Sequence, residues 1–240
     1  MRLTRRKLRF AVLICVAAVA TAVFLLHTKE PRYAGRPLSY WLAQYRPSTG
    51  QYGSAAEAQE AETAVRAIGT NAIPFLVGWL RFEPGAVKEW ISRNVARLPD
   101  KIFRSRYVQE KVINSTPDLW SERATEGFKI LGPAGAPAIP ELMRLVNAPN
   151  TDFSAARSLY ALGHIGKAAF PEFVTLIQDS RHPQRARAID IVGYMSEWGV
   201  DVSSLRPVLL PCLYDTNAFV RAAATNALRE VDREVLTGQP

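Results

Sequence analysis

The sequence predicts an all-α protein, an α-solenoid of about six antiparallel helix pairs preceded by a transmembrane helix near the N-terminus. A turn block that recurs along the chain, and a spacing of about 33 residues between equivalent helix ends, predict the solenoid. A long apolar run, residues 10–26, predicts the membrane helix. The expected organisation is a basic flank and anchor (1–28), a linker with a capping helix (29–53), the repeat array (54–236) and a tail (237–240).

Residues 10–26 contain one polar residue, Thr21, and follow a cluster of basic residues. As a helix this run would be about 26 Å long, close to the roughly 30 Å hydrocarbon core of a bilayer. Basic residues before a membrane span orient the N-terminus toward the cytoplasm, so we expect an exported repeat domain. A signal peptide cleaved near Ala20-Thr21-Ala22 is the alternative, and it would make the protein secreted.

After a polar linker that contains Pro31 and Gly35, the chain enters a short predicted helix. Leu38, Trp41 and Leu42 share one side of this helix. We expect it to cover the first helix pair, because the terminal unit of a solenoid has an apolar edge that needs a cap. An aromatic peptide-binding patch is the alternative interpretation of the same residues.

The recurring block joins the two helices of a pair. An apolar residue, a glycine, two residues, a small residue, one further residue and a proline occur in this order at 68–74, 131–137 and 165–171. Glycine after an apolar stripe favours a helix end, because it adopts a left-handed backbone without a Cβ clash. Proline suits the first turn of the next helix, where its missing N–H has no partner to lose.

Apolar residues on both sides of the block have the spacing of amphipathic helices. The stripes are Val220, Ala223, Ala224, Ala227, Leu228 and Val231 in the last first helix, Ile73, Leu76, Val77 and Leu80 in one second helix, and Leu205, Val208, Leu209, Cys212 and Leu213 in another. Polar residues suited to cap first helices are Ser54, Asp118, Asp152 and Asn217, and Pro183 is expected to open a further helix. One pair cannot bury its own stripe, so we expect the pairs to stack and share a core.

The predicted ends of successive first helices recur at steps of 30, 33, 34, 33 and 33 residues. These ends are Ile68, Leu98, Leu131, Ile165, Trp198 and Val231. A fixed period in this range indicates stacked helix pairs. Two units depart from the pattern, because Leu98 is followed by Pro99 rather than glycine, and the proline after Gly199 is delayed to Pro207.

The segments Gly132–Leu142, Gly166–Phe173 and Val220–Leu228 resemble HEAT repeats of the short kind also seen in phycobilisome lyase-like proteins. The resemblance covers about 54 to 236, which is most of the chain. It implies a HEAT/armadillo-type superhelix whose second helices line a concave side that holds the partner.

That implied orientation points to four residues of predicted second helices as partner-binding candidates: Trp79, Arg81, Glu141 and Arg144. We expect the bound partner to be a protein or a peptide. Tandem repeats, a membrane anchor and no recognisable catalytic motif together indicate a non-enzymatic interaction scaffold. A lyase-like enzyme, or an accessory subunit of an enzyme, is the alternative.

The formal net charge is +8, and five of the basic residues lie within the first nine positions. The rest of the chain is close to balanced, with 25 basic and 22 acidic residues. A nucleic-acid-binding protein usually concentrates basic residues on one face of the fold, so no nucleic-acid partner is expected. The densest basic stretch, 88–111, is the best candidate for an anion-binding patch, although such a run is more commonly a solvated face.

No catalytic, metal or cofactor motif is recognisable. Cys15 and Cys212 show no Cys-x-x-Cys spacing, and none of His27, His164 and His182 has a second ligand at metal-binding spacing. HEAT-like enzymes related to deoxyhypusine hydroxylase bind two irons through His-Glu pairs, and this sequence has no His-Glu dipeptide. His164 is expected to be a structural turn residue bonded to the backbone. We therefore expect no cofactor, metal or small-molecule substrate.

Overall fold

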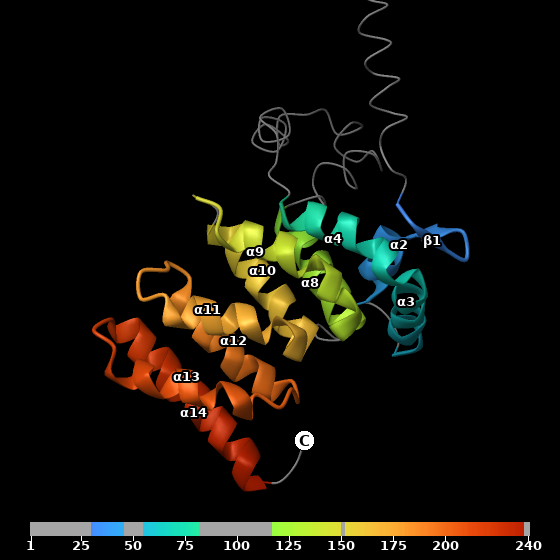
Figure 1. The fold of residues 1–240 in the computed structure, drawn as a ribbon. Coiled ribbons are helices and arrows are strands. Elements are labelled where there is room, and N and C mark those ends of the chain that lie inside the picture. The colour runs from blue at the N-terminus through green and yellow to red at the C-terminus, as the bar shows by residue number, and fades with distance from the viewer. Residues whose placement is uncertain (1–29, 46–54, 82–116, 150–151, 238–240) are drawn as a thin grey trace, which may run out of the picture.

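The computed structural model describes residues 30–45, 55–81, 117–149 and 152–237 (Figure 1). The expected anchor at 10–26, the cap Ser54, and the second unit with Leu98 and the basic stretch 88–111 lie outside these residues. Within the described ranges, no helix combines the length and the apolar content that crossing a bilayer requires.

The described chain is all-α apart from one small hairpin near its start. Strands β1 (Arg32–Tyr33) and β2 (Arg36–Pro37) pair antiparallel, with Arg32 opposite Pro37. Ala34 and Gly35 form the turn, both with positive φ (46° and 74°), as a two-residue hairpin turn of this kind requires. This stretch was expected to be a plain connector. That expectation was wrong, and alanine at a positive φ gives no turn signal in the sequence.

Helix α2 (Leu38–Gln44) packs against α3 and α8 and buries Leu38, Trp41 and Leu42, as its apolar spacing predicts. The Trp41 indole N–H donates a hydrogen bond to the carbonyl of Tyr33 at 3.2 Å, which fixes the hairpin to the helix.

Long first helices alternate with shorter second helices. The first helices are α3 (Ala55–Ile68), α8 (Pro117–Leu131), α10 (Asp152–Ile165), α12 (Arg185–Glu197) and α14 (Ala218–Thr237). The second helices are α4 (Ile73–Leu80), α9 (Ile139–Val146), α11 (Phe170–Gln178) and α13 (Arg206–Leu209). The turns between them contain the 3₁₀ segments η1 (Gly69–Ala72), η4 (Gly132–Ala138), η5 (Gly166–Ala169) and η6 (Ser203–Leu205).

The predicted turn chemistry is confirmed at four turns. Gly69, Gly132, Gly166 and Gly199 all have positive φ, between 52° and 80°. The prolines in the first turns of the second helices are Pro74, Pro140, Pro171 and Pro207. In the middle block it is thus Pro140 that opens the helix, whereas Pro137 lies inside η4.

The helix ends predicted at Ile68, Leu131 and Ile165 are confirmed, and Trp198 is the C-cap of α12. The end predicted at Val231 is wrong, because α14 continues to Thr237. The next glycine after Val231 is Gly238, so no residue there favours the left-handed backbone that ends the other first helices.

Several predicted helix starts shift. Asp118 and Asp152 lie within the first turns of α8 and α10 rather than before them, and α12 begins at Arg185, two residues after Pro183. Asn217 is confirmed as a cap, since its side-chain oxygen accepts the N–H of Phe219 at 2.9 Å.

The stripe predicted as one helix over 205–213 is divided between η6, α13 and η7 (Leu210–Tyr214). Pro211 lies at the start of η7, and its missing N–H accounts for the end of the α-helix. Leu205, Leu209 and Cys212 nevertheless face the core.

Helices that contact one another follow the order of the chain. α4 packs on α8, α8 on α10, α10 on α12, and α12 on α14, so the fold progresses from α3 at one end to α14 at the other (Figure 1). One continuous apolar core runs through these contacts, with Phe128 and Phe173 among its fully buried side chains.

Arg185 joins three segments at the C-terminal end. Its side chain is 12% exposed and donates hydrogen bonds to the Ile177 carbonyl at 2.6 Å and to the Asp215 carboxylate. A third, longer contact of 3.6 Å reaches the Cys212 sulfur. The guanidinium therefore fixes the start of α12 against the end of α11 and the turn before α14.

Candidate protein-interaction surface

Four rings form a continuous aromatic surface across two first helices. Tyr160 and His164 lie on α10, Tyr194 and Trp198 belong to α12 and its C-cap, and we call these four residues the aromatic ladder. The ring centroids are 6.1 Å apart between Tyr160 and Tyr194, 4.0 Å between His164 and Trp198, and 6.3 Å between Tyr194 and Trp198. These three pairs are stacked, with interplanar angles of 17° to 24°.

The repeat places these rings side by side. Within each helix the two aromatic residues are four positions apart, which puts them on one face. Between the helices, Tyr160 and Tyr194 are 34 residues apart, and so are His164 and Trp198. Equivalent positions of successive repeats therefore carry the ladder.

Gly163 lets α10 and α12 approach closely. A Cβ atom at this position would lie 2.7 Å from Ile191 and 3.1 Å from the Trp198 ring. Both large rings on α12 nevertheless remain open to solvent, since Tyr194 and Trp198 are each 39% exposed.

His164 is a neutral aromatic surface at physiological pH. Burial, and secondarily the positive charge of Lys129, lowers the pKa of His164 from 6.5 to about 4. No hydrogen bond to the His164 ring is found among the described residues, so the expected backbone bond is not seen there and stacking on Trp198 holds the ring.

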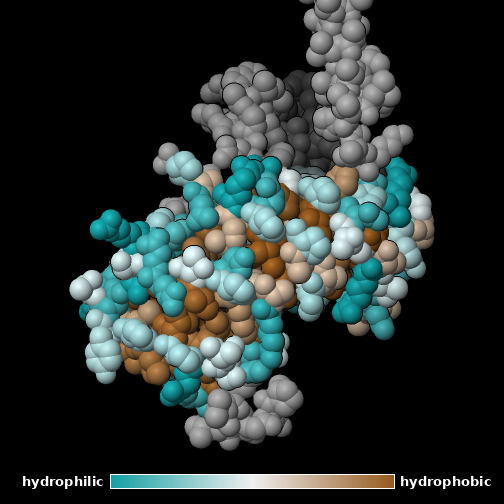
Figure 2. Space-filling model, in the orientation of Figure 1, coloured by the Kyte–Doolittle hydropathy of each residue, from teal (hydrophilic) through white to brown (hydrophobic). Residues whose placement is uncertain are grey.

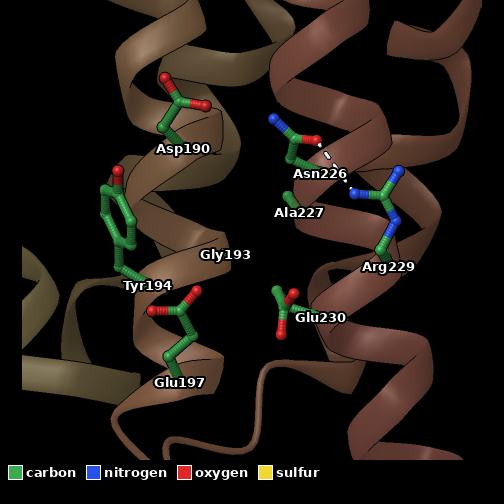
Figure 3. Close-up of a pocket in the computed structure, with 8 residues that line it drawn as sticks. All are labelled: Asp190, Gly193, Tyr194, Glu197, Asn226, Ala227, Arg229 and Glu230. Carbon is green, nitrogen blue, oxygen red and sulfur yellow. Dashed lines mark hydrogen bonds between the residues drawn. The ribbon is translucent and has the colours of Figure 1, made fainter.

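A pocket of about 220 Å³ lies beside the ladder, between α12 and α14 (Figure 3). Gly193 and Ala227 form its floor, because a Cβ at Gly193 would lie only 3.2 Å from the Ala227 backbone. Small residues thus bring the helices together, and longer side chains stand around the contact. The residues around the pocket are Asp190, Tyr194, Glu197, Asn226, Arg229 and Glu230.

Carboxylates outnumber cations in this lining. Glu197 on α12 and Glu230 on α14 stand on opposite sides of the gap, with Asp190 one helical step from Tyr194 (Figure 3). The Arg229 guanidinium is directed toward Asn226, 3.5 Å from its side-chain oxygen, and Glu230 pairs with Arg233. Asp190 and Glu197 therefore supply most of the uncompensated negative charge of the pocket.

The titration behaviour of the lining residues agrees with this negative potential. The pKa of Tyr194 is raised, first by Tyr160, then by burial, and then by the charges of Asp190 and Glu197. Burial raises the pKa of the Asp190 carboxyl, against an opposing effect of Arg187.

The pocket continues along the same helices into an open trough of about 510 Å³. Asp190 and Asn226 line both spaces, and Phe219, which is 78% exposed, stands at the far end. The space-filling view shows apolar areas in the middle of the molecule and toward the α12–α14 end, each rimmed by polar residues (Figure 2). Rimmed apolar areas of this kind are typical of interaction surfaces.

The four residues predicted to bind a partner divide into two groups. Arg81, Glu141 and Arg144 come together, because Glu141 forms ion pairs with both arginines, at 2.9 Å to Arg144. The Arg81 pKa is lowered by burial and by the neighbouring Arg144 charge. Trp79 is half-buried, with its ring centroid 5.0 Å from that of Trp120.

No group of His, Cys, Asp and Glu residues in the described ranges has the arrangement of a metal site. Comparison with protein-family models, with curated proteins and with solved structures finds no match. The functional argument therefore rests on the geometry of this chain.

Sequence reasoning missed the aromatic ladder and the pocket, because the predicted binding face was that of the second helices. A signal was present, since the aromatic pair at 160 and 164 recurs at 194 and 198. The repeat period would have aligned these pairs on neighbouring helices.

Proposed function

We propose that this protein is a HEAT-type α-solenoid that acts as a non-enzymatic scaffold and binds a protein partner through the aromatic ladder. In this proposal residues 10–26 tether the chain to a membrane, and the repeat array lies on the extracytoplasmic side. The chain-order contacts between helices and the four glycine turns support the solenoid. The apolar run after a basic flank supports the tether.

The exposed ladder is the observation that carries the binding function. Tyrosine and tryptophan contribute large, rigid contact areas and are enriched among residues that dominate interface energies. Tyr194 and Trp198 offer such area beside a groove. The alternative surface at Arg81, Glu141 and Arg144 is weaker, because these side chains already pair with each other and exposed pairs contribute little.

Site-specific photocrosslinking in the native host tests the function. The full chain would carry a benzophenone amino acid in place of Tyr194 or, as a matched control, in place of Gln59, an exposed residue of α3. We expect one defined protein adduct from position 194, identified by mass spectrometry and lost in a Trp198→Ala background. Equal adducts at both positions, or none from position 194, would overturn the proposal.

The tether is tested by the intact mass of the protein extracted from membranes. An uncleaved N-terminus together with resistance to alkaline extraction is the expected result. A mass that begins near residue 23 would instead show a cleaved signal peptide and a secreted protein.

A further inference from the structure

We propose that the segment of the partner that binds here is a basic peptide, and that an arginine or lysine side chain of it enters the pocket between α12 and α14. The inference rests on the proposed scaffold function and specifies the chemistry of its ligand. In this arrangement the cation lies against Tyr194 and faces the carboxylates of Asp190 and Glu197 (Figure 3).

The first argument is the charge of the pocket. Of its charged lining residues, Asp190, Glu197 and Glu230 are acidic, and Arg229, engaged with Asn226, is basic. Glu230 has Arg233 as its own partner, whereas Asp190 and Glu197 have no ion pair among the described residues. An entering cation would complete these two carboxylates, and an entering carboxylate or phosphate would be repelled by them.

The second argument is how this chain treats its other aromatic rings. Arg36 lies 4.8 Å from the Tyr40 ring centroid, Arg123 lies 5.0 Å from that of Trp120, and Arg157 lies 5.3 Å from that of Phe153. Such cation–π contacts are favourable within about 6 Å. In the described part of the chain, no Lys or Arg stands over the ring of Tyr160, Tyr194 or Trp198. A ligand guanidinium would occupy the position that an internal arginine occupies elsewhere.

The third argument is shape. At about 220 Å³ the pocket is smaller than the roughly 300–1,000 Å³ of sites that enclose a drug-sized molecule, so it suits a single side chain. The adjoining trough runs along the same two helices toward Phe219, which gives the flanking residues of an extended peptide a path. On the other side, Trp198 and His164 continue the aromatic surface toward α10.

Fluorescence anisotropy with two peptides on the full chain tests the inference. One labelled nonapeptide is Gly-Ser-Arg-Ser-Gly-Ser-Arg-Ser-Gly, and the other carries citrulline, which has nearly the same shape but no charge, in place of each arginine. We expect a Kd no weaker than about 1 mM for the arginine peptide and at least tenfold weaker binding of the citrulline peptide. Higher salt should weaken the arginine complex.

Variants locate the binding. Glu197→Gln and Asp190→Asn should each weaken the arginine peptide several-fold, whereas Glu60→Gln, an exposed control on α3, should leave its Kd unchanged. Equal binding of the two peptides, no binding of either, or equal effects of Glu197→Gln and Glu60→Gln would overturn the inference. Circular dichroism of each variant confirms that its helix content is intact.

The outcomes separate the inference from the proposed function. A protein crosslinked at position 194 whose contact segment lacks arginine and lysine would leave the scaffold function standing and overturn the basic-peptide inference. An arginine peptide that binds through Glu197, with no crosslinked protein at position 194, would support the pocket chemistry and count against the scaffold.

Discussion

The stacked position of His164 predicts a stability that depends on pH. The pKa of this imidazole falls from 6.5 in the unfolded chain to about 4 in the fold, mainly because of burial and then because of Lys129. The unfolded state therefore binds more protons than the folded state between these two values. The contribution is fully present above about pH 6.5 and is lost as the pH falls toward 4.

The magnitude follows from the two pKa values. At 1.36 kcal/mol per pH unit, the difference between 6.5 and about 4 corresponds to roughly 3 kcal/mol of unfolding free energy. Carboxylates such as Asp190 also titrate in acid, so wild-type stability alone does not isolate the histidine. The variant His164→Phe keeps a ring on Trp198 and removes the titration.

The assay is urea unfolding of both full-length proteins, followed by far-ultraviolet circular dichroism from pH 7.5 to pH 4. The stability of the wild type relative to His164→Phe should fall by about 2–3 kcal/mol across this range. A difference that stays constant with pH would show that His164 is not held neutral by burial, and the reasoning would fail.

Three further changes test the packing. Gly127→Val should lower the unfolding free energy by about 1–3 kcal/mol, because a Cβ there would lie 2.5 Å from a leucine of α4. Gly78→Ala, which enters open space within α4, should raise it by up to about 1 kcal/mol. Arg185→Met should cost about 3 kcal/mol or more by leaving a buried carboxylate unpaired, whereas Lys167→Gln, in an exposed pair, should cost at most about 1 kcal/mol. Urea titrations check all three, and equal effects within either matched pair would contradict the packing described here.

The helix boundaries could be predicted where the local backbone decides them. Gly132 and Gly166 end their helices because glycine alone takes the left-handed backbone without strain, a rule that is visible in sequence. Helix α14 passes Val231 because no such residue follows, and the predicted end there relied on the period alone. The hairpin at Ala34 is set by contacts with α2, such as the Trp41 bond to Tyr33, and no local pattern encodes those contacts.

The candidate site was harder to predict, because it depends on how two helices approach each other. The floor of the pocket exists because Gly193 meets Ala227, a contact 34 residues apart in sequence. Neither residue is unusual by itself. The residues chosen from the resemblance, Arg81, Glu141 and Arg144, have the expected exposure, but the sequence did not reveal that they pair with one another.

Selection of binders from a random peptide library on the full-length protein tests the central claim most directly, since it assumes nothing about the ligand. The account predicts sequences enriched in arginine and lysine, whose binding is lost with Tyr194→Ala and Glu197→Gln and kept with Glu60→Gln. Selected peptides that are acidic, or that bind all three variants equally, would contradict it.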